Sequence, residues 1–358
     1  MLTLLAGAGC SRRPYIEWDV EVYNVTGVVR IANFDKEYED TAWDSLFNTA
    51  NRLLPKLDPK NKDGDIAAIN GLQEDARWPA PVDVFRLLLL ANYYSGFTDG
   101  AFDITVAPLR SLWGVESRTP PAEPPDEEAI LATLPSVGAK LLNLGDDGTV
   151  SFASPIAGIH LGPLTDAYVV DSSIVLMRGY GATNVYVKLG TARRAAGRPK
   201  AKTYWTEPIP DPAGSTNSIG RVDLRGNSSV VILQRRDSLF RIGDEYFSTQ
   251  FDPRTGRPAT GTALVVVIGP TCTKSSALAQ ALLVSGLDGA PGLLGKFPRH
   301  DALIIPEETP TTAWMSKGFA DRFVEEPGFS LTKKVIETLP ATVTPAPDSS
   351  ANRPSSTL

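Results

Sequence analysis

The sequence is poor in the residues that most often build metal centres and covalent catalytic sites. It has two cysteines and two histidines in 358 residues. Two cysteines, Cys10 and Cys272, make no disulfide framework. Two histidines argue against a histidine-rich metal site or a Ser-His-Asp triad. No run approaches the about 20 apolar residues that span a bilayer. A formal net charge of −6 argues against a nucleic-acid partner, for which a basic patch is expected.

What is present is an ordinary globular composition, with 42% hydrophobic and 21% charged residues. Such a chain builds one sizeable core or two modest ones. No G-x-G-x-x-G follows a predicted strand, so the pattern does not support a Rossmann domain. The sequence predicts an α+β fold: a mixed or antiparallel sheet core with packed helices on one side, in a single two-lobed unit. Apolar periodicity predicts strands over 15–35, 184–189, 221–233, 245–251, 264–268 and 302–305, and helices over 41–54, 79–95, 165–177 and 274–285.

The two ends differ in composition from the middle. MLTLLAGAGC resembles the end of a bacterial lipoprotein signal, in which small residues precede a cysteine that becomes lipidated. We therefore expect residues 1–14 to be a signal remnant and linker. Cys10 would be the lipidation site of a membrane-anchored protein on the extracytoplasmic, periplasmic side. Residues 331–358 are rich in Pro, Ser and Thr and are expected to be disordered.

The most informative stretch is TDGAFDITVAPLRSLWG, residues 98–114. It shows neither a helical stripe nor strand alternation. Gly100 and Ala101 allow close approach of the backbone, while Phe102 offers a flat face and Asp103 two acceptor oxygens. This arrangement suits a ring with an exocyclic amine or a ribose hydroxyl. The alternative is a buried loop with a capping aspartate, and the residues alone leave both interpretations open.

This stretch resembles the signature G-A-F-D-x-T-V-x-P-L-x-x-L-W-G of the FAD:protein FMN transferases, the ApbE-type thiamine biosynthesis lipoproteins. Further similarity follows in the family's order and covers most of residues 20–310. It implies an ApbE-like, T-fold-type domain over residues 15–330. The segments that carry it are 64–70 (GDIAAIN), 161–171 (LGPLTDAYVVD), 205–212 (WTEPIPDP), 252–258 (DPRTGRP) and 277–282 (ALAQAL).

The resemblance implies a magnesium-dependent transferase. FAD is cleaved at its pyrophosphate, and FMN is attached to a Thr or Ser of a target flavoprotein of an extracytoplasmic redox complex. Phosphoryl transfer of this kind needs a hard cation and exact positioning. The family frame makes Asp166 the candidate catalytic position. The candidate flavin-nucleotide contacts that it implies are Ala101, Phe102, Asp103, Asp166 and Asp252.

The sequence departs from the family pattern where the cation should bind. Ser276 and Gln280 stand in place of the aspartate and threonine ligands, and Pro163 lies in the segment that supplies a backbone carbonyl. Neutral oxygens hold Mg²⁺ more weakly than a carboxylate does. We therefore favour a degenerate copy that at most binds FAD. The alternatives are an active transferase with atypical ligands, for example Asp166 or Asp171, and a non-catalytic scaffold lipoprotein.

Overall fold

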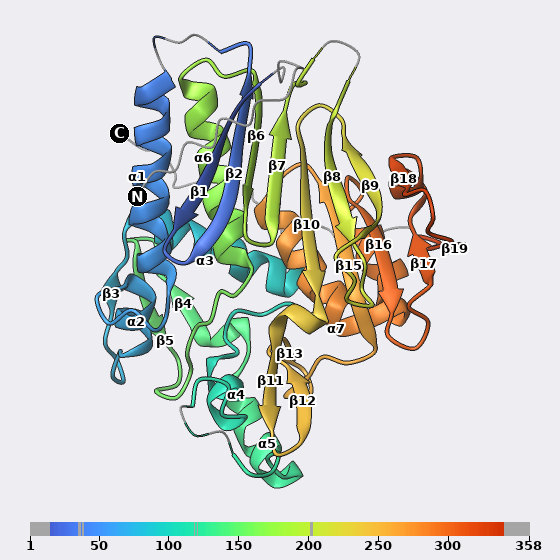
Figure 1. The fold of residues 1–358 in the computed structure, drawn as a ribbon. Helices are drawn as coiled ribbons and strands as arrows, with labels where there is room; N and C mark the ends of the chain where they lie inside the picture. The colour runs from blue at the N-terminus through green and yellow to red at the C-terminus, as the bar shows by residue number, and fades with distance from the viewer. Residues whose placement is uncertain are drawn as a thin grey trace, which may run out of the picture.

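A nine-stranded sheet forms the centre of the protein (Figure 1). The computed structural model describes residues 15–34, 37, 39–117, 119, 121–200 and 203–339. Neighbouring strands are antiparallel, except for the last pair, which is parallel. The sheet order is β1 (Ile16–Val22), β2 (Val25–Ala32), β6 (Asn184–Leu189), β7 (Ala192–Ala196), β10 (Ser228–Gln234), β15 (Thr262–Gly269), β16 (Asp301–Pro306), β17 (Thr312–Met315) and β19 (Thr332–Val335).

The first strands form a hairpin where one strand was predicted over 15–35. Tyr23 and Asn24 have φ values of 51° and 61°, and Val22 pairs with Val25 across them. Two consecutive left-handed residues are the requirement of the tight type I′ hairpin turn. A connection after Leu224, in which Gly226 has a φ of 69°, divides the predicted strand 221–233 between β9 (Ser218–Leu224) and β10, which lie in different sheets.

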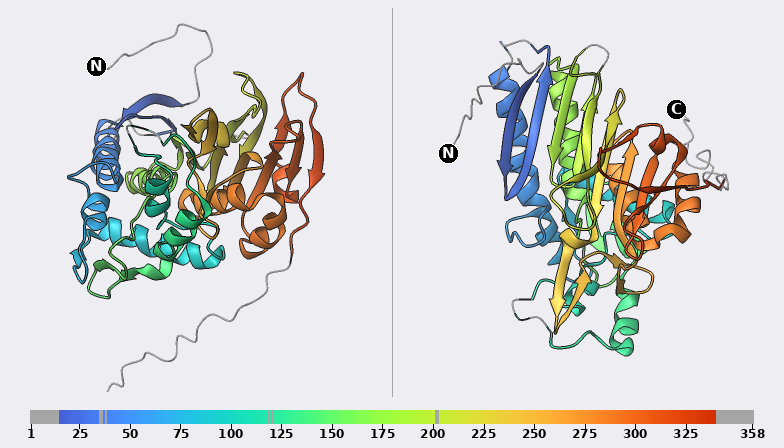
Figure 2. Two further views of the ribbon diagram at one scale, coloured as in Figure 1. Left: turned by 90° about the horizontal axis from the view of Figure 1, so that it is seen from below. Right: turned by 45° about the vertical axis from the view of Figure 1, so that its right-hand side comes forward.

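The central strands are buried on both faces, which explains their continuous apolar runs. Val231, Leu233, Val265 and Val267 belong to the core beneath the helices, and the alternate residues belong to a second core on the opposite face. The helices lie on one side of the sheet (Figure 2). They are α1 (Glu39–Leu57), α2 (Asp65–Asn70), α3 (Val82–Phe97), α6 (Leu164–Gly179) and α7 (Cys272–Lys296).

The opposite face is covered by a smaller antiparallel sheet. It consists of β18 (Phe323–Glu325), β9 and β8 (Trp205–Pro210). Trp205 and Ile209 pack into the second core with Ile232 and Ile268. The short α8 (Lys317–Ala320) adds Phe319 to the same core.

A second, smaller lobe lies below the sheet (Figure 1). It has its own core, in which Leu109, Trp113, Ile130 and Phe251 are buried. The α+β fold with two lobes is therefore as predicted. The lobe contains α4 (Ala107–Leu112), α5 (Glu127–Thr133), β11 (Leu239–Ile242), β12 (Glu245–Ser248), β13 (Phe251–Asp252) and β14 (Arg257–Pro258). A further small sheet is formed by β3 (Trp78–Pro79), β4 (Leu142–Leu144) and β5 (Thr149–Phe152).

One predicted helix end is wrong. The first helix was predicted to end at residue 54, before Pro55, but α1 continues to Leu57. The helix predicted over 274–285 is present: α7 consists of two helices joined by a kink at Gly286, whose φ of 58° and ψ of −153° are non-helical, and the second helix, up to Lys296, was not predicted. By length and composition α7 is apolar enough to cross a membrane. Its buried side chains join the core beneath the sheet, so it serves as a core helix.

The expectation of disorder over 331–358 is wrong for its first residues. Thr332–Val335 forms β19, which pairs in parallel with β17. Backbone pairing with an open sheet edge orders this segment without a large apolar contribution, since its side chains are exposed. The remaining residues of the predicted tail, from 340 on, lie outside the described residues, as do residues 1–14 with Cys10.

Candidate functional site

Two cavities meet between the lobes at Arg110 and His160, which line both. The smaller cavity holds about 20 Å³, room for about one water. It lies between the Ala101–Asp103 loop, the segment before α6 and the middle of α7. From the sequence we expect a cleft between the Ala101–Asp103 loop and the starts of the helices over 165–177 and 274–285; the cavity lies further along α7, at Gln280 and Val284. The larger cavity holds about 500 Å³, within the range of small-molecule sites. Its polar wall contains Lys60, Asn70, Arg110, Ser111, Glu116, Ser117 and His160.

The loop that carries the predicted flavin contacts is fixed by its own backbone. The Gly100 amide donates to the Ser95 carbonyl (2.9 Å), and Gly100 has a φ of 73°. This closes α3 in a left-handed turn that glycine adopts without strain. The Thr98 hydroxyl accepts the Phe102 amide at 3.1 Å. Ala101 and Phe102 are each 2% exposed and line the smaller cavity.

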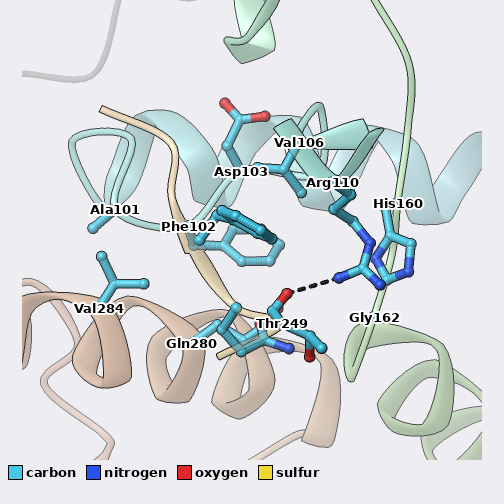
Figure 3. A pocket seen from close by; sticks show the side chains of 12 residues that line it. Ala101, Phe102, Asp103, Val106, Arg110, His160, Gly162, Thr249, Gln280 and Val284 are labelled. Atoms are coloured by element: carbon cyan, nitrogen blue, oxygen red, sulfur yellow. Dashed lines mark hydrogen bonds between the residues drawn. The ribbon is translucent and has the colours of Figure 1, made fainter. Parts of the chain in front are cut away.

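Asp103 uses its carboxylate to hold the protein together. Its Oδ1 accepts the Thr105 amide (2.8 Å) and hydroxyl (2.6 Å), and its Oδ2 accepts the Ser95 hydroxyl (2.7 Å) and the Ala139 amide (2.8 Å). A carboxylate has about four acceptor positions, so all are occupied. Figure 3 shows the group pointing away from Arg110, His160 and Gln280. This geometry supports the structural interpretation of Asp103 that the sequence left open.

The α7 wall brings Ser276 and Gln280 together, as their one-turn spacing predicts. Ser276 is fully buried and Gln280 is 9% exposed. The Gln280 side-chain amide donates to both Ser276 O and Ser276 Oγ at 3.3 Å. The amide thus occupies the acceptor that a cation would need. Its oxygen lies toward Gly162, where an added Cβ would be 3.8 Å away.

A divalent cation does not fit these positions. The Pro163 carbonyl accepts the Ala167 amide in the first turn of α6. Neither Ser276 nor Gln280 supplies the anionic oxygen that Mg²⁺ prefers. Across the part of the chain that the structure describes, no three His, Cys, Asp or Glu side chains are grouped to hold a metal ion.

Asp166 and Asp171, which the sequence offered as alternative metal ligands, are each hydrogen-bonded to other parts of the protein. Asp166 accepts the Thr191 amide at 3.1 Å, and burial raises the pKa of Asp166 to about 6 against the opposing effect of that bond. Asp171 accepts the Cys272 and Thr273 amides, both at 2.9 Å, and thereby caps α7. It also pairs with Arg194 at 2.8 Å. Neither carboxylate lines the two cavities.

Asp252 closes the turn in which it was predicted. Its Oδ1 accepts the Arg254 amide (2.9 Å) and Nε (2.8 Å), and its Oδ2 accepts Nη2 (2.9 Å). Arg254 also donates to Ser285 Oγ of α7 at 3.3 Å. The Trp113 indole donates to the Gly256 carbonyl at 3.0 Å, so the turn is joined to the smaller lobe. Asp252 itself lines neither cavity.

Sequence reasoning missed the charged group at the junction of the cavities. Arg110 donates through Nε (2.9 Å) and Nη2 (2.5 Å) to Glu116 Oε1 and through Nη1 (2.7 Å) to the Thr249 carbonyl. Lys60 pairs with Glu116 Oε2 at 2.7 Å. The signal in the sequence was Arg110 itself, which stands between the apolar residues of the LRSLW segment. An arginine in such a segment is expected to be buried with a partner, because Arg is seldom buried without one.

Comparison with known proteins identifies the family to which the chain is similar. The model of the ApbE family matches residues 17–304. The chain belongs to the ApbE family. Two members named FAD:protein FMN transferase are each 26% identical to it. The Escherichia coli K12 protein aligns over 275 residues, 75% of this chain and 78% of its own, and the Treponema pallidum protein over 301 residues, 78% and 81%.

Solved ApbE structures share the fold. The ApbE protein of Thermotoga maritima has a TM-score of 0.78 and 22% identity, covering 87% of this chain and all of that chain. The apo form of the flavinyl transferase ApbE of Pseudomonas stutzeri has a TM-score of 0.75 and 22% identity, covering 86% and 96%. The chain therefore has the ApbE fold. The side chains that α7 contributes to the smaller cavity, Gln280 and Val284, carry no charge.

Proposed function

We propose that this ApbE-family protein binds a flavin nucleotide without a divalent cation and does not transfer it. One observation carries the proposal: the Gln280 amide donates to Ser276, at the two positions where the resemblance to the family implies metal ligands. Without a cation the pyrophosphate of FAD lacks the charge neutralisation that phosphoryl transfer requires.

The cavities support binding rather than catalysis. The larger cavity, about 500 Å³, combines apolar wall residues such as Ala107 and Ile159 with several polar groups. Such a mixture is typical of sites for small organic ligands. The curated relatives carry the name FAD:protein FMN transferase, which makes FAD the first ligand to test, with a target flavoprotein as the partner.

Calorimetry with FAD, in EDTA and in millimolar Mg²⁺, tests the binding. We expect the same dissociation constant in both buffers. Release of AMP and FMN from FAD, followed by chromatography, tests catalysis without knowledge of the target protein, and we expect none above a protein-free control. Mg²⁺-dependent release of AMP would establish an active transferase with atypical ligands. Absence of FAD binding would favour the scaffold alternative.

We also propose that the mature protein is attached to a membrane on the periplasmic side through Cys10. The support is the MLTLLAGAGC segment, which ends in the cysteine that lipoproteins modify. Mass spectrometry of the protein expressed in a bacterial host should show a lipid-modified N-terminal cysteine. The Cys10→Ser variant should lack the modification and leave the membrane fraction. An unmodified Cys10 in the wild type would contradict the proposal.

A further inference from the structure

The junction of the two cavities carries an excess of positive charge. Glu116 lies between two cations: its Oε1 accepts from Arg110 and its Oε2 from Lys60. Burial raises the pKa of Glu116, but the hydrogen bond from Lys60 and the charge of Arg110 outweigh it, so the pKa is lowered. Glu116 therefore remains ionised near neutral pH. Two cations and one anion leave this group one positive charge in excess.

Arg110 has hydrogen-bond donors to spare. Its side chain is 9% exposed, and three of its N–H groups donate to Glu116 and to the Thr249 carbonyl. A guanidinium has five N–H groups, so two are free for a ligand. The planar group is held in place by these bonds, and a fixed guanidinium is well suited to the oxygens of a phosphate.

His160 lies beside Arg110 in Figure 3 and adds a neutral donor. Burial, followed by the charge of Arg110, lowers the pKa of His160 to about 3. The ring is therefore neutral at pH 7, with one N–H and one acceptor nitrogen. Its ring nitrogens have no hydrogen bond to any residue in the described part of the chain. Gly162 leaves space next to the ring, because a Cβ there would lie 3.6 Å from Nδ1.

Besides Glu116, the carboxylate of Asp58 also acts on His160, where it opposes the lowering of the His160 pKa. Asp58 accepts the Tyr23 hydroxyl (2.8 Å) and the Lys60 amide (2.9 Å) and lines neither cavity. Asp103 lines the smaller cavity, but its oxygens are occupied and face away. The remaining polar side chains of the smaller cavity are neutral: Thr249, Gln250 and Gln280. The wall is therefore rich in donors and lacks the anionic oxygens that attract a cation.

We propose that Arg110 and His160 bind the phosphate of a mononucleotide directly, with the rest of the ligand in the 500 Å³ cavity. This inference rests on the proposed flavin-nucleotide binding and adds how the phosphate is recognised. A protein cation replaces the magnesium ion as the partner of the phosphate. The site should therefore prefer FMN to riboflavin, which has the same ring and no phosphate.

Titration of the full-length chain with FMN and with riboflavin, both in EDTA, tests this preference. Quenching of flavin fluorescence gives the two dissociation constants. We expect FMN to bind about tenfold more tightly or better, since a charge-assisted pair is worth at least that much. Inorganic phosphate should weaken FMN binding and leave riboflavin binding unchanged, which would locate the free anion in the same site.

The double variant Arg110→Gln/Glu116→Gln removes the guanidinium together with its carboxylate partner, so that the net charge of the group stays the same. It should abolish the preference for FMN and retain riboflavin binding. Circular dichroism checks its folding. If it does not fold, Lys60→Gln, which removes an exposed cation from the same group, should reduce the preference about threefold. Lys62→Gln is the matched control, because Lys62 is exposed and lines neither cavity.

Equal affinities for FMN and riboflavin in the wild type would overturn the phosphate site and leave the proposed flavin binding intact. A preference for FMN that survives in Arg110→Gln/Glu116→Gln would also overturn it. Failure of FAD, FMN and riboflavin to bind at all would overturn both proposals.

Discussion

The two walls of the smaller cavity match the family signature to different degrees, although the polar groups of both walls are bonded within the protein. The Ala101–Asp103 wall keeps the signature, but the Asp103 carboxylate already accepts four hydrogen bonds from the protein itself. The α7 wall departs from the signature, and there the Gln280 amide and Ser276 bond to each other. The Asp103 carboxylate thus holds the loop together, and under our proposal Ser276 and Gln280 set what the site can bind.

The largest effect should come from the wall that keeps the signature. Asp103→Ala leaves the Thr105 and Ala139 amides without their acceptor, together with two hydroxyls. Each bond to a charged acceptor contributes about 1.5–3 kcal/mol, and the terms are not additive, so we expect a loss of about 5 kcal/mol. Urea denaturation measures it.

Asp99→Ala is the control in the same turn. Asp99 is 73% exposed and pairs only with Lys296, so its loss should cost less than about 1 kcal/mol. Comparable losses in the two variants would show that Asp103 does not hold the loop. The comparison between the walls would then have to be abandoned.

The next effect should come from rebuilding the other wall. Ser276→Asp places an unpaired carboxylate at a fully buried position. In EDTA we expect a loss of stability of about 4 kcal/mol, because a buried charge without a partner is costly. In Ser276→Asp/Gln280→Thr, millimolar Mg²⁺ should recover part of that loss, which thermal unfolding in the two buffers would show.

Ser276→Ala is the matched control, with an expected loss below about 1 kcal/mol, since Ser276 Oγ accepts only one bond of 3.3 Å. If the double variant shows no response to Mg²⁺, more than the two ligands has been lost from the site. A response would mean that the cavity still has the geometry of a cation site.

Features of the fold that depend on residues close in sequence could be predicted, and features that depend on contacts between distant segments could not. Periodicity located the helices and the buried strands, because the spacing of apolar residues follows which faces of an element are buried. The second helix of α7 was missed, since it follows the kink at Gly286 and is held by the packing of Leu293 and Leu294 in the core. Likewise β19 depends on pairing with β17, which no local signal in a Lys- and Thr-containing segment predicts.

Of the predicted site residues, Ala101, Phe102, Asp103 and Gln280 line the smaller cavity and Asp166 and Asp252 do not, and the electrostatics of the cavities were missed. The motif comparison found Asp103, Ser276 and Gln280. It could not find the Lys60–Glu116–Arg110 group, because the two cations come from segments about 50 positions apart and meet only in the fold. Nor could it reveal that Asp103 points away from the cavity, which depends on the Ala139 amide.

Asp166, which supports neither wall, should show a smaller effect that depends on pH. Because the folded-state pKa of Asp166 is raised to about 6, the folded protein keeps this proton to higher pH than the unfolded chain. Stability therefore falls as pH rises from about 4 through about 6. A shift of about two pKa units corresponds to about 3 kcal/mol, which partial exposure reduces to about 2 kcal/mol.

Asp166→Asn should remove this penalty. We expect the variant to be about 2 kcal/mol more stable than the wild type at pH 7.5 and equally stable at pH 4, by urea denaturation. The variant Asp171→Asn is the contrast: it weakens the cap of α7 and the pair with Arg194, so it should lose stability at pH 7.5. Destabilisation by Asp166→Asn at pH 7.5 would show that its charge is needed.

The smallest effect should come from the ion pair of the 252–258 turn, which also keeps the family signature. Arg254 is 42% exposed and bonds to Asp252 two residues away. Such local, solvated pairs contribute about 0.5 kcal/mol, and salt screens them. Arg254→Ala should therefore lower the free energy of unfolding by about that amount, and less in about 0.5 M salt. Arg257→Ala in the same turn, which removes an exposed ion pair with Glu127, gives the scale for a solvated pair. A loss above about 2 kcal/mol would mean that the bond from Arg254 to Ser285 fastens this turn to α7 as firmly as Asp103 fastens its own loop.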